Sequence, residues 1–213
     1  MNRTYLSALG AMMMPAAAAS AVSLGQVDTF DSNTQNWLEG LPSPNQPFIT
    51  SDGGSGDNFL RNVSSGDNAP GGAMAMFNRA QWAGDYVSAG VNFISMDVRN
   101  SGETDLFMRM AFQGSDGTRY ATNGVYLIEP GTGWQSISFS LTDMTLIAGG
   151  TSLFDTLGNV FEARLLSAVN PSFQGDFFEG TLDVDNIRAL PLPSPGAGGL
   201  LAVAGIASLR RRR

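Results

Sequence analysis

The side chains of this sequence that can do chemistry are almost all carboxylates. The chain has 19 Asp and Glu residues and no His or Cys, and all 12 of its basic residues are arginines. Thiolate and His-containing metal sites, Ser-His-Asp triads, lysine Schiff bases and P-loops are therefore excluded. Acid–base chemistry is left to Asp and Glu, with Tyr or Arg as weaker options. Carboxylates also supply the oxygen ligands that calcium prefers.

Four aspartates are candidate metal ligands. Asp31 and Asp185 could meet if the strands that carry them pair, and Asp28 and Asp183 are second choices. Asp183 and Asp185 share a strand face, whereas Arg188 should point to the other face. A structural calcium ion is the one cofactor that these residues suggest. The alternative is that they are solvated or turn-capping acids.

Sugar binding needs exposed aromatic rings with polar partners nearby. The candidates are Trp82, Tyr86, Tyr120, Tyr126 and Arg109, with Trp134 and Arg119 as further options. The alternative is packing in the core. We expect this of Trp37 and Trp134, which adjoin strands, and residues 82–86 resemble a packed corner.

Catalysis has the weakest support. A glycosidase can work with two carboxylates alone, but the five Glu residues are scattered and lie mostly beside turns. The Glu-x-Asp-x-x-Glu pattern of jelly-roll endoglucanases is absent, as is Gly-x-Ser-x-Gly. We therefore expect a protein that is not an enzyme.

The elements that must position these residues are short strands. Gly-, Asn- and Asp-rich turns recur through the middle of the chain, and apolar residues alternate with polar ones over residues 91–99, 105–113 and 134–140. About nine or ten strands are predicted, with one short helix over residues 151–157. Such strands bury their apolar faces sheet on sheet. The fold class predicted for residues 23–189 is all-β, a two-sheet β-sandwich of jelly-roll type.

Residues 1–22 have the features of a secretory signal peptide. Arg3 precedes an apolar stretch over residues 5–19, and small residues around Ala21 offer a cleavage site. The expected structure is a helix that is removed on export. The alternative is an N-terminal helix of the domain.

Residues 190–213 form a second terminal signal. A Pro-rich hinge is followed by 14 uncharged residues over 196–209 and then by Arg210, Arg211, Arg212 and Arg213. As a helix this stretch spans about 21 Å, short of a bilayer core of about 30 Å. The arginines would stay cytoplasmic, so the segment is a marginal membrane anchor.

The three-part layout resembles the PEP-CTERM sorting signal of bacterial proteins that exosortases process. The motif here is Pro193-Ser194-Pro195, without the Glu that usually separates the prolines. The resemblance implies that an exosortase-type sorting enzyme cuts the tail near this motif. The protein would then be exported to the cell envelope or the extracellular space after transient membrane anchoring. The alternative is an anchor helix that is never cut.

The middle of the chain carries a second resemblance. It begins with VDTFD at 27–31 and Trp37, continues with GDNFL at 56–60 and ends with LDVDNI at 182–187. These segments resemble galactose-binding-like jelly rolls, which include many carbohydrate-binding modules. The resemblance implies that the early acidic segment lies beside the late Asp-bearing strand, where such domains often hold a structural calcium.

The charge distribution completes the prediction. Five arginines lie in the two terminal signals, which leaves seven arginines against 19 acids between them, a formal charge of −12. Such a surface disfavours nucleic acid. We expect an exported, envelope- or matrix-associated, non-catalytic β-sandwich with extracellular polysaccharide as a partner. A secreted carboxylate-dependent glycoside hydrolase and a structural surface protein without ligand are the alternatives.

Overall fold

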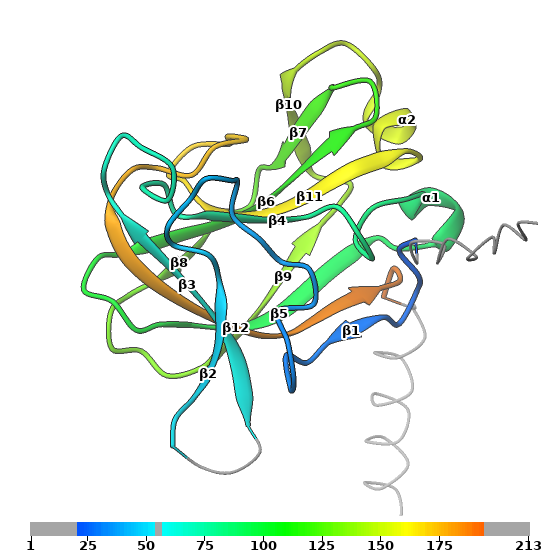
Figure 1. The fold of residues 1–213 in the computed structure, drawn as a ribbon. Coiled ribbons are helices and arrows are strands. Elements are labelled where there is room, and N and C mark those ends of the chain that lie inside the picture. The colour runs from blue at the N-terminus through cyan, green and yellow to red at the C-terminus, as the bar shows by residue number, and fades with distance from the viewer. Residues whose placement is uncertain (1–20, 54–56, 194–213) are drawn as a thin grey trace, which may run out of the picture.

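Alternating apolar and polar residues form strands throughout the part of the chain that the computed structural model describes, residues 21–53 and 57–193. The strands assemble into two antiparallel six-stranded sheets (Figure 1). This confirms the predicted all-β sandwich. Nearly all of the predicted signal peptide lies outside the described residues, as does the predicted tail beyond Pro193. No helix of the described part is long and apolar enough to cross a membrane.

The first sheet has the order β2-β3-β12-β5-β9, and β1 pairs with β12. Its strands are β1 (Val27–Asp28), β2 (Phe48–Ser51), β3 (Asn58–Ser65), β5 (Phe93–Asn100), β9 (Gln135–Ser140) and β12 (Glu179–Leu190).

The second sheet has the order β10-β7-β6-β11-β4, and β8 pairs with β6. Its strands are β4 (Ala75–Asn78), β6 (Leu106–Gly114), β7 (Arg119–Thr122), β8 (Tyr126–Ile128), β10 (Met144–Ala148) and β11 (Val160–Ser167). The described residues thus hold more strands than expected, because short ones such as β1 and β8 carry too few residues to show an alternating pattern.

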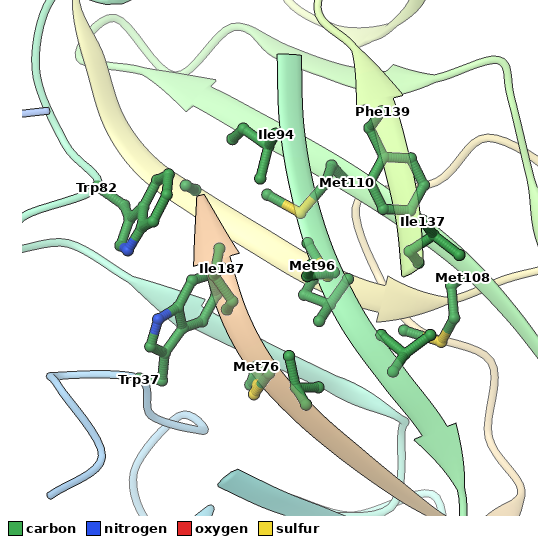
Figure 2. Packing of buried hydrophobic residues seen from close by; sticks show 14 of the residues in the cluster. Trp37, Met76, Trp82, Ile94, Met96, Met108, Met110, Ile137, Phe139 and Ile187 are labelled. Carbon is green, nitrogen blue, oxygen red and sulfur yellow. The ribbon is translucent and has the colours of Figure 1, made fainter. Parts of the chain in front are cut away.

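The core lies between the two sheets. Ile94 and Met96 of β5 and Phe139 of β9 face Met108 and Met110 of β6 (Figure 2), and all five are almost fully buried. The expected burial of the apolar faces of these alternating strands is therefore confirmed for β5 and β9. Each such side chain contributes about 1.5–3 kcal/mol through removal from water.

Two short helices complete the described part. The helix α2 (Leu153–Leu157) lies within the predicted 151–157, and the Ser152 side chain caps it by accepting a hydrogen bond from the Asp155 amide. The helix α1 (Tyr86–Ala89) was not predicted. It is a single turn capped at its C-terminal end by Gly90, whose φ of 72° favours glycine.

Candidate functional site

The strands near the two ends of the domain pair directly. In the antiparallel pair β1–β12, Val27 lies opposite Arg188 and Asp28 opposite Ile187. This is the condition on which the predicted meeting of Asp31 and Asp185 depended. The four predicted metal ligands nevertheless have quite different surroundings.

Asp28 is a buried acceptor within the core. Its Oδ2 accepts hydrogen bonds from the indole Nε1 of Trp37 (2.8 Å), the indole Nε1 of Trp82 (2.7 Å) and the Gln81 amide (3.0 Å). Burial raises the pKa of Asp28, although these hydrogen bonds oppose the rise. The carboxylate therefore fixes the two tryptophans, and its prediction as a calcium ligand was wrong.

Asp183 is neutralised by arginines. Its carboxylate is fully buried and lies 2.6 Å from Nε of Arg61 and 2.8 Å from Nη2 of Arg99, and it also accepts from the Ser101 hydroxyl. Burying a carboxylate is tolerated when charge partners and hydrogen bonds surround it. A calcium ion would have to displace both guanidinium groups, so this prediction was wrong as well.

A bulge in β12 changes which residues share its outer face. The register shifts between Asp185 and Arg188, where Asn186 adopts a left-handed φ of 52°. Asp185 lies opposite Asp97 and Arg188 opposite Ser95, two positions on the same face of β5. Arg188 therefore points to the same side as Asp185, contrary to the expectation.

Asp185 is half-buried at this bulge, and its pKa is raised to about 6. Burial is the main cause, and the carboxylates of Asp57, Asp97 and Asp31 add to it, while the Asn186 amide opposes the rise. Asp31 itself is exposed and accepts from the Thr29 hydroxyl at 2.6 Å. The described residues contain no group of three or more acids placed to hold a metal ion. Calcium at Asp31 and Asp185 stays a prediction.

Three predicted sugar-stacking rings are core residues instead. Trp82 and Tyr86 are fully buried, and the Tyr86 hydroxyl donates to the Trp82 carbonyl at 2.8 Å. Residues 82–86 therefore form a packed corner, which was the alternative to sugar binding. Tyr120 is also buried, and its hydroxyl donates to the Thr151 carbonyl. None of these rings has a free face for a sugar, so their prediction was wrong.

Arg109 is buried, and its side chain has a structural role. Its guanidinium donates to the carbonyls of Ala168 (2.9 Å), Val169 (2.7 Å) and Thr122 (2.8 Å), and burial lowers its pKa. These bonds join β6 to the end of β7 and to the loop after β11. They leave the guanidinium little capacity for a sugar, which contradicts its predicted role. Tyr126 is half-buried beside a hollow of about 350 Å³, with its hydroxyl donating to the Ser138 carbonyl.

Trp134 is the exception among the tryptophans, and its expected burial was wrong. It is 39% exposed, just before β9, and its ring packs edge-on against Phe59 with 5.3 Å between centroids. The Arg99 guanidinium lies 4.8 Å from the Trp134 centroid and helps to fix the ring.

Beside Trp134, on the first sheet, lies a groove of about 410 Å³, which we call the Trp134 groove. Its lining is one aromatic wall and a set of polar acceptors: Asp52, Asp57, Phe59, Asp97, Trp134, Asp185 and Asn186. The volume is in the range of small-ligand sites, about 300–1,000 Å³.

The polar groups of the groove are held in place by one another. Asn186 donates through Nδ2 to Asp97 at 3.0 Å and to Asp185 at 3.1 Å, and the Ser136 hydroxyl also donates to Asp97. Sequence reasoning found Asp185 and missed Asp97 and Asn186. The outward position of Asp97 in the alternating β5 pattern was the signal that could have found it.

Comparisons with solved structures identify the fold. A family 11 carbohydrate-binding module from Clostridium thermocellum, in complex with a β-1,3-1,4-mixed-linked tetrasaccharide, matches at 19% identity. The match covers 81% of this chain and 99% of that one, with a TM-score of 0.50. The solution structure of the module CtCBM11 matches at 17% identity over 83% and 99% of the chains, with a TM-score of 0.52. This domain has the jelly-roll fold of carbohydrate-binding modules.

Enzymes with a similar domain are matched over a smaller share of their length. An exo-β-agarase matches at 13% identity over 78% of this chain and 25% of its own, with a TM-score of 0.53. The carbohydrate-binding-module fold of this chain thus spans about a quarter of that enzyme. No family model and no curated protein matches this sequence.

Proposed function

We propose that this protein is an exported, non-catalytic β-sandwich that binds a neutral polysaccharide in the Trp134 groove. The observation that carries the proposal is the exposed ring of Trp134 beside the acceptors Asp97 and Asp185 and the amide of Asn186. An indole ring offers a flat apolar surface to a pyranose ring. Carboxylates and amides bind its hydroxyl groups.

The charge of the groove favours a neutral ligand. Four of its lining residues are aspartates, and Arg99, which borders it, is engaged by Asp52 and Asp183. An anionic sugar would therefore meet repulsion, whereas a hydroxyl donor would meet acceptors. The matched module with a bound β-1,3-1,4-tetrasaccharide supports a glycan ligand, and makes mixed-linked β-glucan the first probe to use.

A binding role accounts for the chain better than catalysis. The fold matches binding modules over almost their whole length and the agarase over only about a quarter of its length. The second candidate is a glycoside hydrolase, favoured by one observation: Asp185, with its pKa raised to about 6, lies opposite Asp97. Glycosidases use two carboxyl groups, one of which acts as a general acid with a raised pKa.

Affinity electrophoresis of the full-length protein tests the proposal, with mixed-linked β-1,3-1,4-glucan, agarose and dextran as probes. We expect retardation by the first or second probe that Trp134→Ala removes. Phe154→Ala is the matched control, because Phe154 is an exposed aromatic residue outside the groove. Unchanged mobility with every probe would overturn the proposal. Release of reducing sugar that Asp185→Asn abolishes would favour the hydrolase.

We also propose that the C-terminal segment directs export and sorting. Support comes from the sequence alone: the Pro193-Ser194-Pro195 motif, the apolar stretch and the terminal arginines. An exosortase-type enzyme would remove the tail after transient anchoring in the membrane. Mass spectrometry of mature protein from its native host is the test, and a retained arginine tail would contradict the proposal.

A further inference from the structure

The outer face of the second sheet carries a row of alternating phenylalanines and arginines. The guanidinium carbon of Arg79 lies 4.4 Å from the ring centroid of Phe77, and that of Arg164 lies 4.1 Å from Phe173. Arg119 stacks on the other end of the row, 4.5 Å from Phe173. We call these five residues the arginine row.

The arginine row is built by the local structure. Phe77 of β4 and Arg164 of β11 are cross-strand partners, which places both on one face. The loop after β11 brings Phe173 over the sheet, and its carbonyl accepts from Nη1 of Arg164 at 2.7 Å. Strands β4, β7 and β11 and the loop after β11 therefore contribute to one surface.

Positive charge exceeds negative charge along this row. Glu162 is the carboxylate that pairs with it, at 2.6 Å from Arg79 and 2.5 Å from Arg164. The pKa of Arg164 is lowered, chiefly by burial, and the neighbouring Arg119 and Arg79 cations add to this. Two of the three guanidinium groups thus share one carboxylate, and Arg119 has no ion-pair partner among the described residues. This positive face lies in a domain whose charge is otherwise strongly negative.

Several guanidinium donors are available to a ligand. Among the described residues, Arg119 donates only through Nε, to Gln113, and Nη1 of Arg79 has no protein acceptor. The Arg79 side chain is 49% exposed. An arginine fork binds a carboxylate through two parallel hydrogen bonds, which these donors permit.

A groove of about 740 Å³ runs beside the arginine row. Phe77, Arg79 and Arg164 line one part of it, and the exposed Phe177 and Gln174 line another. Its size accommodates a short saccharide segment. Glu39 also lines the groove, and burial raises its pKa, which makes it easier to protonate than an ordinary glutamate.

We propose that the arginine row and its groove bind an anionic polysaccharide built from uronic acids, at a second site separate from the Trp134 groove. The sugar carboxylates would pair with Arg79 and Arg119, and the apolar faces of the rings would lie against Phe77 and Phe177. Charge complementarity selects this occupant, because a neutral polymer would leave the guanidinium groups unpaired. The site does not depend on the proposed function of the Trp134 groove.

The test is the affinity of the full-length protein for polygalacturonate, measured by calorimetry at about 50 mM and 300 mM salt. Dextran serves as the neutral polymer and poly-glutamate as an acidic polymer without sugar rings. We expect polygalacturonate to bind most tightly and to weaken with salt, because exposed charges are screened. The double variant Arg79→Gln/Arg119→Gln should bind about tenfold more weakly, as loss of two charge-assisted contacts implies.

Two control variants separate this site from the other. Arg188→Gln removes an exposed arginine from the first sheet and should leave polygalacturonate binding unchanged. Trp134→Ala should remove only binding of neutral glycan. If the double variant melts below the assay temperature, Arg119→Gln alone provides the test, because its Nη groups donate no hydrogen bond to a described protein atom.

Three results would overturn the proposal. The first is equal affinity for polygalacturonate and dextran at low salt. The second is equal binding of poly-glutamate and polygalacturonate, which would show charge attraction without sugar recognition. The third is a salt-sensitive dimer that the double variant abolishes, without polygalacturonate binding, which would assign this face to a second copy of the chain.

Discussion

Replacing Asp185 by Asn should make the protein more stable at neutral pH. In the folded state Asp185 is half-buried near three other aspartates, and its pKa rises from the ordinary 3.8 to about 6. The ionised form is therefore disfavoured by folding. An Asn side chain keeps an oxygen that can accept from the Asn186 amide, now 2.7 Å from Oδ1, and removes the charge.

The magnitude follows from the change in pKa. A rise of the pKa by about 2 corresponds to about 3 kcal/mol, because one pKa unit is equivalent to about 1.36 kcal/mol. Because the side chain is partly solvated, screening reduces this to about 1 kcal/mol. For a domain of this size the melting temperature should rise by about 2–4 °C at pH 7.

The direction of the pKa shift determines how the stability difference between the wild type and Asp185→Asn changes with pH. An acid with a raised pKa contributes stability that is fully present below its unfolded pKa, near pH 4, and lost as the pH rises through about 6. The wild type should therefore lose stability relative to Asp185→Asn between pH 4 and 6, and the difference in stability should be smallest at pH 4.

Thermal denaturation followed by circular dichroism at pH 4, 5, 6 and 7 measures this difference. Asp105→Asn is the control, because Asp105 is an exposed acid outside the groove. A variant that is less stable at pH 7, with the loss appearing only when calcium is present, would refute the reasoning. It would instead support a calcium ion between Asp31 and Asp185.

Other substitutions test the remaining structural roles. Asp183→Asn should lower the free energy of unfolding in urea by about 3–5 kcal/mol, because two arginines lose their buried partner; a metal-ligand role would instead make the loss depend on EDTA. Arg109→Met should cost about 3 kcal/mol in the same assay, since it leaves buried carbonyls without donors, and an unchanged midpoint would contradict this. Gly72→Ala should prevent stable folding, because its Cβ would lie 1.6 Å from the Asp67 carbonyl oxygen, whereas Gly124→Ala, with no atom within 4 Å, should melt like the wild type.

Features that depend on the local order of apolar and polar residues could be predicted from the sequence. The period-two alternation in β5 and β9 correctly assigned their buried faces, because one face of each strand packs on the opposite sheet. The helix α2 lies within the predicted segment 151–157, which contains its capping residue Ser152. The pairing of β1 with β12 was implied by the family resemblance.

The site depended on contacts that no local pattern records. Asp183 is separated from Arg61 by 122 residues and from Arg99 by 84, so its neutralisation could not be deduced from its neighbours. Trp82 is buried in the core, where its indole donates to Asp28, 54 residues away. The bulge at Asn186 reversed the expected direction of Arg188, and bulges leave little trace in sequence.

Tryptophan fluorescence during titration with neutral polysaccharide tests the central claim most directly. The chain has three tryptophans. Trp37 and Trp82 are buried and donate to Asp28, whereas Trp134 is exposed at the groove. With mixed-linked β-1,3-1,4-glucan or agarose, we predict a saturable change in emission that Trp134→Phe abolishes. A saturable change that persists in Trp134→Phe, or tight binding without any change in emission, would contradict binding in the Trp134 groove.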